Sequence, residues 1–193
     1  MNITNPKEVM IKSLEVACSF DAYLKTQELH NTDVSTDIEY QKNYNSYYRV
    51  RRDRNWLNAY YDFMESHKND QDISFEKILR EISSVPHNAK NGTIKSIEAS
   101  FASKMLATIN PNYPIWDSQV IRALDISIDP TLVGEDKIMA YVEAYTKLTR
   151  EIGDFIKTTE GQMCIKQFDA TFPNLTYLNS FKKIDYYLWN IGK

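Results

Sequence analysis

The scarcity of glycine and proline constrains the fold of this chain more than any other feature. Of its 193 residues, 5 are Gly and 6 are Pro. A many-stranded protein would use Gly, Asn-Gly and Asp-Gly pairs in its hairpin turns, and this sequence has few of them. With 42% hydrophobic residues, the chain can bury a sizeable core without disulfide bonds or metals. We therefore expect an all-α fold that forms one helical domain over residues 1–193, with at most a short strand pairing.

Apolar residues recur at helical spacing through most of the chain. This periodicity predicts helices over residues 6–29, 36–67, 74–85, 94–109, 117–124, 134–158, 160–170 and 179–191. The most polar interruption, PHNAKNGT at residues 86–93, is expected to be a loop. Any strand pairing is expected near residues 126–133.

Charge and motif content exclude several classes of function. The net charge of -3 provides no overall attraction to nucleic acid or to an anionic membrane. Phosphate-binding glycine loops, nucleophile elbows and H-E-x-x-H pairs are missing from the sequence, so we expect no metal and no cofactor. Cys18 and Cys164 lie in helix-like contexts and are expected to be buried structural thiols. The N-terminal segment has no signal-peptide core and nothing long enough to span a bilayer, which predicts a cytoplasmic protein without a membrane partner.

Basic residues alternate with aromatic ones in YYRVRRDRNW, residues 47–56. The cationic side chains there are Arg49, Arg51, Arg52 and Arg54. Interleaved basic and aromatic side chains can hold phosphates and stack bases. The same run can also be a solvated helix face whose arginines pair with nearby carboxylates. Both interpretations remain open from the sequence.

The stretch NPNYPIWDSQVIRAL, residues 110–124, carries most of the functional information. Pro111 and Pro114 prevent the preceding helix from continuing, so the residues up to Trp116 should form a rigid crossing between two helices. Asp117 is a good N-cap for the second helix. Capping alone would explain this aspartate, with Ile115 and Trp116 filling the core.

The same stretch resembles the segment around the catalytic aspartate of the helix-hairpin-helix DNA glycosylase superfamily, which includes the 8-oxoguanine glycosylases. The matching residues are Pro114, Ile115, Asp117, Ser118, Val120 and Arg122. The resemblance implies a base-excision hydrolase of DNA repair. In that superfamily the aspartate caps its helix and also stabilises positive charge on the sugar as the glycosidic bond breaks.

The resemblance also suggests roles for other residues around a central cleft. Asp117 would be catalytic, and Lys104 is the candidate amine nucleophile, although helical spacing places it off the buried stripe and favours an exposed or snorkelling lysine. Arg122 and the four arginines of residues 49–54 would bind nucleic acid. Trp116, Tyr113 and Trp56 would stack on a base or line the cleft.

Two hypotheses follow from these observations. In the first, the protein flips a nucleotide of DNA or a modified nucleotide into the cleft and releases its base. In the second, the same fold is a non-catalytic binding module for a nucleotide or a protein partner, and Asp117 is only a cap. The net charge favours the second hypothesis. So does the stretch HNAKNGTIKS, which has a single Gly92 where the superfamily has a glycine-rich, phosphate-gripping hairpin.

Overall fold

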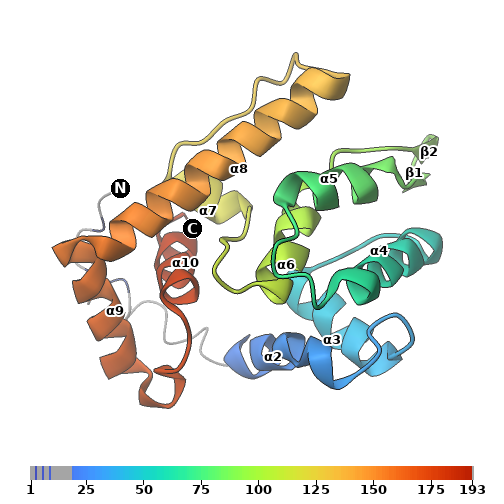
Figure 1. Ribbon diagram of the computed structural model, residues 1–193. Coiled ribbons are helices and arrows are strands. Elements are labelled where there is room, and N and C mark those ends of the chain that lie inside the picture. The colour runs from blue at the N-terminus through green and yellow to red at the C-terminus, as the bar shows by residue number, and fades with distance from the viewer. Residues whose placement is uncertain (1–2, 4–5, 7–8, 10–18, 193) are drawn as a thin grey trace. The chain divides into compact units, whose positions relative to one another are not determined.

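The computed structural model describes residues 3, 6, 9 and 19–192 (Figure 1). Within these residues the chain is helical apart from one antiparallel pair of short strands, which confirms the expected all-α fold. The chain divides into two compact units. The N-terminal unit is Cys18–Asn110, and the C-terminal unit is Pro111–Lys193 together with Met1–Ala17. The single domain expected over residues 1–193 stays a prediction.

Helices of the N-terminal unit follow the apolar periodicity after residue 73, except that the helix expected from residue 94 begins at Ala99, since Ile94 lies in a strand. Their bounds are α2 (Ser19–Thr26), η2 (Gln27–Asn31), α3 (Ile38–Tyr48), α4 (Arg54–His67), α5 (Phe75–Ser84) and α6 (Ala99–Ile109). Of the helix expected over residues 6–29, residues 7–8 and 10–18 lie outside the described residues, and so does the predicted thiol Cys18. Ser74 caps α5, because its Oγ accepts the N–H of Lys77 at 3.1 Å.

The single long helix expected over residues 36–67 is wrong, because two helices, α3 and α4, occupy this range. Arg49 ends α3 in the left-handed conformation, with a φ of 53°. Asp53 then caps α4 by accepting the N–H of Trp56 at 3.1 Å. The basic run is therefore mostly a connector between two helices and not one face of a helix.

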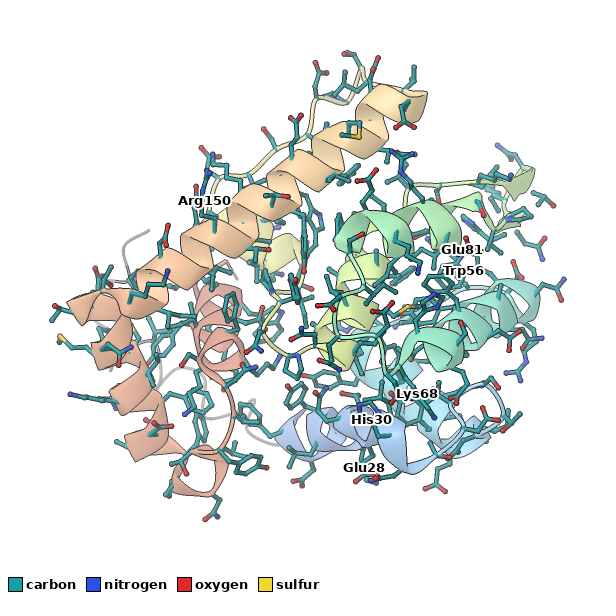
Figure 2. All side chains as sticks on the ribbon, in the orientation of Figure 1. Glu28, His30, Trp56, Lys68, Glu81 and Arg150 are labelled. Carbon is teal, nitrogen blue, oxygen red and sulfur yellow. The ribbon has the colours of Figure 1, made fainter. Side chains whose placement is uncertain are left out.

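A cluster of buried aromatic rings forms the core of the N-terminal unit. Trp56 on α4, labelled in Figure 2, is fully buried together with Tyr44, Tyr60 and Tyr61. The hydroxyls of Tyr44 and Tyr60 lie 2.9 Å apart, and Tyr60 also donates to the carbonyl of Phe101 on α6 at 3.1 Å. A buried hydroxyl without a partner costs about 1–3 kcal/mol, so these bonds fix how α3, α4 and α6 pack.

Residues 86–93, expected to be a loop, mostly form a hairpin. Strand β1 (His87–Ala89) pairs antiparallel with β2 (Gly92–Ile94), and Gly92 has a φ of 118°, a conformation that favours glycine. Asp53 ties this hairpin to α4, because its Oδ2 accepts the N–H of Asn88 at 2.7 Å. The expectation of a strand pairing near residues 126–133 is wrong, since that segment is irregular.

The C-terminal unit has the helices that the sequence predicts. Their bounds are α7 (Ser118–Ala123), α8 (Gly134–Lys157), α9 (Thr159–Thr171), η3 (Pro173–Leu175) and α10 (Ser180–Ile191). Helix α10 packs against α7, α8 and α9 (Figure 1). The end of α10 approaches α7 so closely that a Cβ on Gly192 would overlap the backbone of Gln119. This approach fixes α7, the helix that Asp117 caps.

Candidate functional site

Asp117 ends the crossing segment and caps α7, as predicted. Its backbone is extended, and its Oδ1 accepts the N–H of Gln119 at 2.9 Å. The side chain is half-buried. Within the part of the chain that the structure describes, Oδ2 accepts no hydrogen bond. Among the described residues, the cap thus uses only one of the two carboxylate oxygens.

Neighbouring helices hold the crossing segment at two carbonyls. The buried hydroxyl of Tyr145 on α8 donates to the carbonyl of Pro114 at 2.7 Å. The side-chain amide of Asn179, which caps α10, donates to the carbonyl of Pro111. The backbone leading to Asp117 is therefore fixed by side chains from α8 and from the start of α10.

A buried ion pair lies on the first turns of α10. Nζ of Lys182 is 3.1 Å from Oδ2 of Asp185, and both side chains are only about one-tenth exposed, at 12% and 11%. Burial raises the pKa of Asp185, while Lys182 lowers it. The negative charge of Asp117 raises this pKa further, which indicates that the two carboxylates interact electrostatically.

Aromatic residues predicted from the crossing segment are half-buried in the C-terminal unit. The Trp116 ring packs edge-on against Tyr141 of α8, with 5.5 Å between the ring centroids. Tyr113 and Trp116 both keep part of their surface exposed. The third predicted stacking residue, Trp56, is fully buried in the core of the N-terminal unit, so its expected role at a ligand site is wrong.

The predicted arginines differ in how far they are engaged by the protein itself. Arg49 and Arg51 are exposed. Arg54 donates to Oε1 of Gln41 at 3.2 Å. Arg122 donates to the carbonyl of Gly192 at 2.7 Å, and so ties α7 to the end of α10. Within the connector, Arg49 and Arg51 remain the residues best able to contact a ligand.

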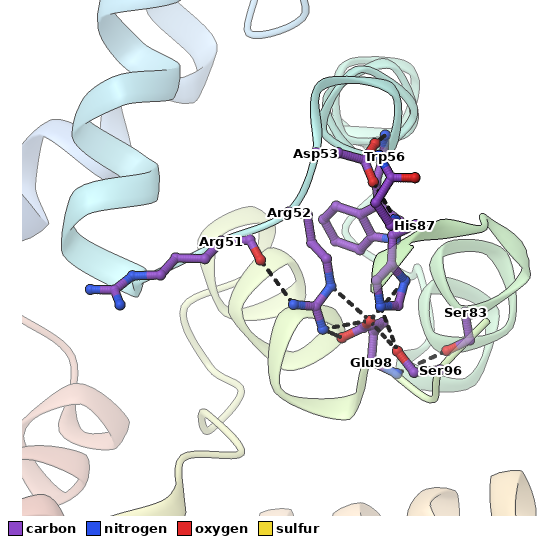
Figure 3. Close-up of polar contacts among 9 residues, drawn as sticks. Arg51, Arg52, Asp53, Trp56, Ser83, His87, Ser96 and Glu98 are labelled. Atoms are coloured by element: carbon purple, nitrogen blue, oxygen red, sulfur yellow. Dashed lines mark hydrogen bonds and ion pairs between the residues drawn. The ribbon is translucent and has the colours of Figure 1, made fainter. Parts of the chain in front are cut away.

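Arg52 is held by Glu98, which precedes α6 and is 6% exposed (Figure 3). Its Nη2 lies 2.8 and 2.9 Å from the two carboxylate oxygens, and Nε lies 3.0 Å from Oε1. The guanidinium also lies over the ring of Phe101, 4.9 Å from its centroid. Arg52 is therefore bound by groups of its own unit. This arrangement does not fit the predicted role of Arg52 in binding phosphate.

Residues of the hairpin, of the segment after it and of α5 complete this network around Glu98. Ser96 donates its hydroxyl to Oε1 of Glu98 at 2.6 Å, and Nδ1 of the buried His87 lies 3.8 Å from the same oxygen (Figure 3). The backbone N–H of Glu98 donates to Oγ of Ser83 on α5 at 3.0 Å. Through its carboxylate and its backbone N–H, Glu98 thus joins α5, α6, the hairpin and the connector before α4.

Lys104 is buried, with 7% of its surface exposed, so the expectation of an exposed or snorkelling lysine is wrong. Its Nζ donates to the carbonyl of Tyr48 at 2.9 Å and lies 5.2 Å from the centroid of the Phe101 ring. The prediction from the apolar stripe failed because α6 is buried on every side from Phe101 to Ile109. Lys104 and Asp117 belong to different units, and their meeting at one site stays a prediction.

The sequence interpretation missed Lys182, Asp185, Glu98 and His87. A signal for the first two was present, since a lysine and an aspartate three residues apart flank Ile184, which the apolar pattern places inward.

Cys164 is buried as expected, and burial raises the pKa of its thiol to about 11. Among the described residues, no three His, Cys, Asp or Glu side chains group closely enough to hold a metal ion. None of the described helices has the length and apolar character needed to cross a membrane.

Comparisons of the chain with known protein families, with curated proteins and with solved structures give no match.

Proposed function

We propose that the protein is a nucleic-acid-processing hydrolase that releases a base by cleaving its N-glycosidic bond, with Asp117 as the catalytic carboxylate. The observation that carries this proposal is that only one carboxylate oxygen of Asp117 takes part in the helix cap. Asp117 needs only Oδ1 to hold the start of α7, and Oδ2 accepts no bond from the described residues. A capping aspartate fixed by its backbone and by one oxygen is pre-organised to present the other oxygen to a substrate.

The proposed reaction breaks the bond between the sugar C1′ and the base nitrogen. The bonding electron pair leaves with the base, and positive charge develops on the sugar. The ionised Asp117 stabilises this charge electrostatically. Water then adds to C1′ and loses one proton, and the departing base gains one, so the net reaction is hydrolysis.

Aromatic and basic side chains support a nucleotide substrate. Trp116 precedes Asp117 in the chain, packs edge-on against Tyr141 and is only half-buried, so it can contact a flipped base. Arg49 and Arg51 are exposed cations on the connector before α4. Phosphate contacts from such residues position a nucleic acid without reading its sequence.

The second candidate function is a binding module in which Asp117 is only a cap. The observation that favours it is that groups of the protein itself bind two cationic side chains that a catalytic site would use. Lys104 donates to a backbone carbonyl, and Arg52 is paired with Glu98. In this alternative the same surfaces bind a nucleotide or a protein without changing it.

The test of the proposal is release of free base from single- and double-stranded oligonucleotides that each carry one modified base. The wild-type protein is expected to release the base from at least one of them. The variant to compare is Asp117→Asn, and its matched control is Asp125→Asn. Asp125 is an exposed aspartate just after α7, and its φ of 51° is a conformation that Asn tolerates. The control should keep full activity. Binding without release from any oligonucleotide would favour the binding module.

A separate prediction concerns the exposed cations. Binding to duplex DNA should weaken as salt rises, because each neutralised phosphate releases counterions. Replacing Arg49 with Asn, which suits its left-handed backbone, and Arg51 with Ala should reduce the slope of log affinity against log salt by about 1.8 if each residue contacts one phosphate. Titration at several salt concentrations measures the slope. Arg150→Ala, an exposed change on α8 (Figure 2), is the control, and an equal loss of slope in that variant would contradict a role for the connector.

A further inference from the structure

Two tyrosines of α8 hold the segment that leads to Asp117. The buried hydroxyl of Tyr145 donates to the carbonyl of Pro114 at 2.7 Å. Tyr141 lies one helical turn earlier and meets the indole of Trp116 edge-on, with 5.5 Å between the ring centroids and 66° between the ring planes. Residues four apart lie on the same face of a helix. One face of α8 therefore fixes both the backbone of this segment and the ring next to Asp117.

The backbone at Trp116 is held on both sides. The N–H of Asp117 donates to the carbonyl of Ile115 at 3.0 Å, which closes a three-residue turn centred on Trp116. The side chain of Ile115 is buried, and Asp117 accepts the N–H of Gln119 as the cap of α7. Since the backbone is held, the direction of the Trp116 ring depends on the side chains that it contacts, and Tyr141 is one of them.

Tyr141 lies at the border of the core of the C-terminal unit. The buried residues of α8 begin at Tyr145, whereas Tyr141 and Trp116 are half-buried. Among the described residues, the hydroxyl of Tyr141 makes no hydrogen bond. What Tyr141 contributes is therefore its ring, which lies against an indole that keeps part of its surface exposed.

We propose that Tyr141 is a positioning residue of the Asp117 site, and that it holds the Trp116 ring as a platform on which a nucleobase stacks. The ligand class is an unpaired base, because stacking on an indole requires a planar ring that has left its own stack. Holding the indole before binding lowers the entropy cost of ordering it in the complex, and so raises affinity. This inference rests on the proposed function for the identity of the substrate, and it concerns binding and not the cleavage step.

The first test follows Trp116 directly. Fluorine NMR of protein labelled with fluorotryptophan reports on Trp56, Trp116 and Trp189 separately, and Trp116→Phe identifies the resonance of interest. The probes are the single-stranded oligonucleotides of the base-release test, added to the Asp117→Asn variant so that the base stays attached, and strands of the same length made only of abasic sugar-phosphates. A strand with bases should shift the Trp116 resonance and leave that of the buried Trp56 in place. An equal shift with the abasic strand, or no shift with any strand, would overturn the inference.

The second test separates the ring of Tyr141 from its hydroxyl. Tyr141→Leu should weaken oligonucleotide binding about fivefold, the lower end of the effect of removing a stacking ring itself, because Trp116 is no longer held. Tyr141→Phe keeps the ring and should bind like the wild type. The rate of base release at saturating oligonucleotide should be the same in both variants. The control is Tyr177→Leu, which changes an exposed tyrosine after η3 and should leave the affinity unchanged.

The outcomes distinguish this inference from the proposed function. Equal affinities of Tyr141→Leu and Tyr141→Phe, or a fall in the saturated rate without a fall in affinity, would contradict the positioning role of Tyr141. The Trp116 resonance tests the platform even if Tyr141→Leu does not fold. Stacking on Trp116 without base release from any oligonucleotide would contradict only the proposed function.

Discussion

Replacing Glu98 with Ala is expected to lower the free energy of unfolding by about 3 kcal/mol, toward the lower end of the cost of breaking a buried ion pair. The change leaves the Arg52 guanidinium, which lies against Phe101, without its carboxylate. It also removes the acceptor of the Ser96 hydroxyl. The side chain of Arg52 is 25% exposed. Water can therefore partly solvate the unpaired guanidinium, and the loss of stability stays near the lower end. Urea denaturation followed by far-ultraviolet circular dichroism measures the loss.

The control for this prediction is Glu81→Ala, an exposed glutamate on α5 that is labelled in Figure 2. This change should alter stability by less than about 0.5 kcal/mol, as is usual on a surface. A double-mutant cycle with Arg52→Met should give a coupling energy of at least about 1 kcal/mol, because the two side chains share three close contacts. Additive losses would show that the pair is not the origin of the stability.

Changing Asp117 to Asn is expected to slow base release by on the order of 10² or more, as for the loss of other electrostatic stabilisers. Asn is about as good a helix cap as Asp, so its side-chain oxygen can still accept the N–H of Gln119. The stability of the protein should therefore change little. What the variant loses is the negative charge that would face the developing sugar cation. Single-turnover kinetics on a responsive oligonucleotide measures this loss.

Two further substitutions separate the cap from the charge. Asp117→Ser keeps a good cap and removes the carboxylate, whereas Asp117→Ala removes both. Only the alanine variant should lose stability, by about 1 kcal/mol. All three variants should be slow in base release. If activity followed stability across the series, the role of Asp117 would be that of a cap alone.

Much of the fold could be predicted from the sequence because helical periodicity is a local signal. Helices α8, α9 and α10 begin and end within a few residues of their expected bounds. The N-caps Ser74 and Asp117 were readable because a short polar side chain precedes a run of apolar spacing. Such features depend on residues close together in the chain.

Breaks and buried charges were harder to predict because they depend on residues that are distant in the chain. Arg49 ends α3 in a left-handed conformation that non-glycine residues seldom adopt, so the periodic aromatics on both sides suggested one helix. The sequence leaves open whether Arg52 binds a ligand or pairs with a carboxylate, and it cannot identify the partner, Glu98, which is 46 positions away. Lys104 was placed at the surface because nothing local indicates that α6 is covered on all sides. Each of these errors concerns a contact set by tertiary packing.

The candidate site shows the same division. The crossing segment and Asp117 were identified from residues 110–124 alone. The buried pair on α10 was not, because the packing of α10 against α7 joins residues that are distant in the chain. Charged residues within an apolar stripe were the one local sign of this arrangement.

The most direct test of the central claim is the ratio of single-turnover rates of base release for the wild type and Asp117→Asn on the same oligonucleotide, with both proteins shown to be folded. The account predicts a ratio on the order of 10² or more, with closely similar melting temperatures. Equal rates in the two proteins would contradict the catalytic role of Asp117.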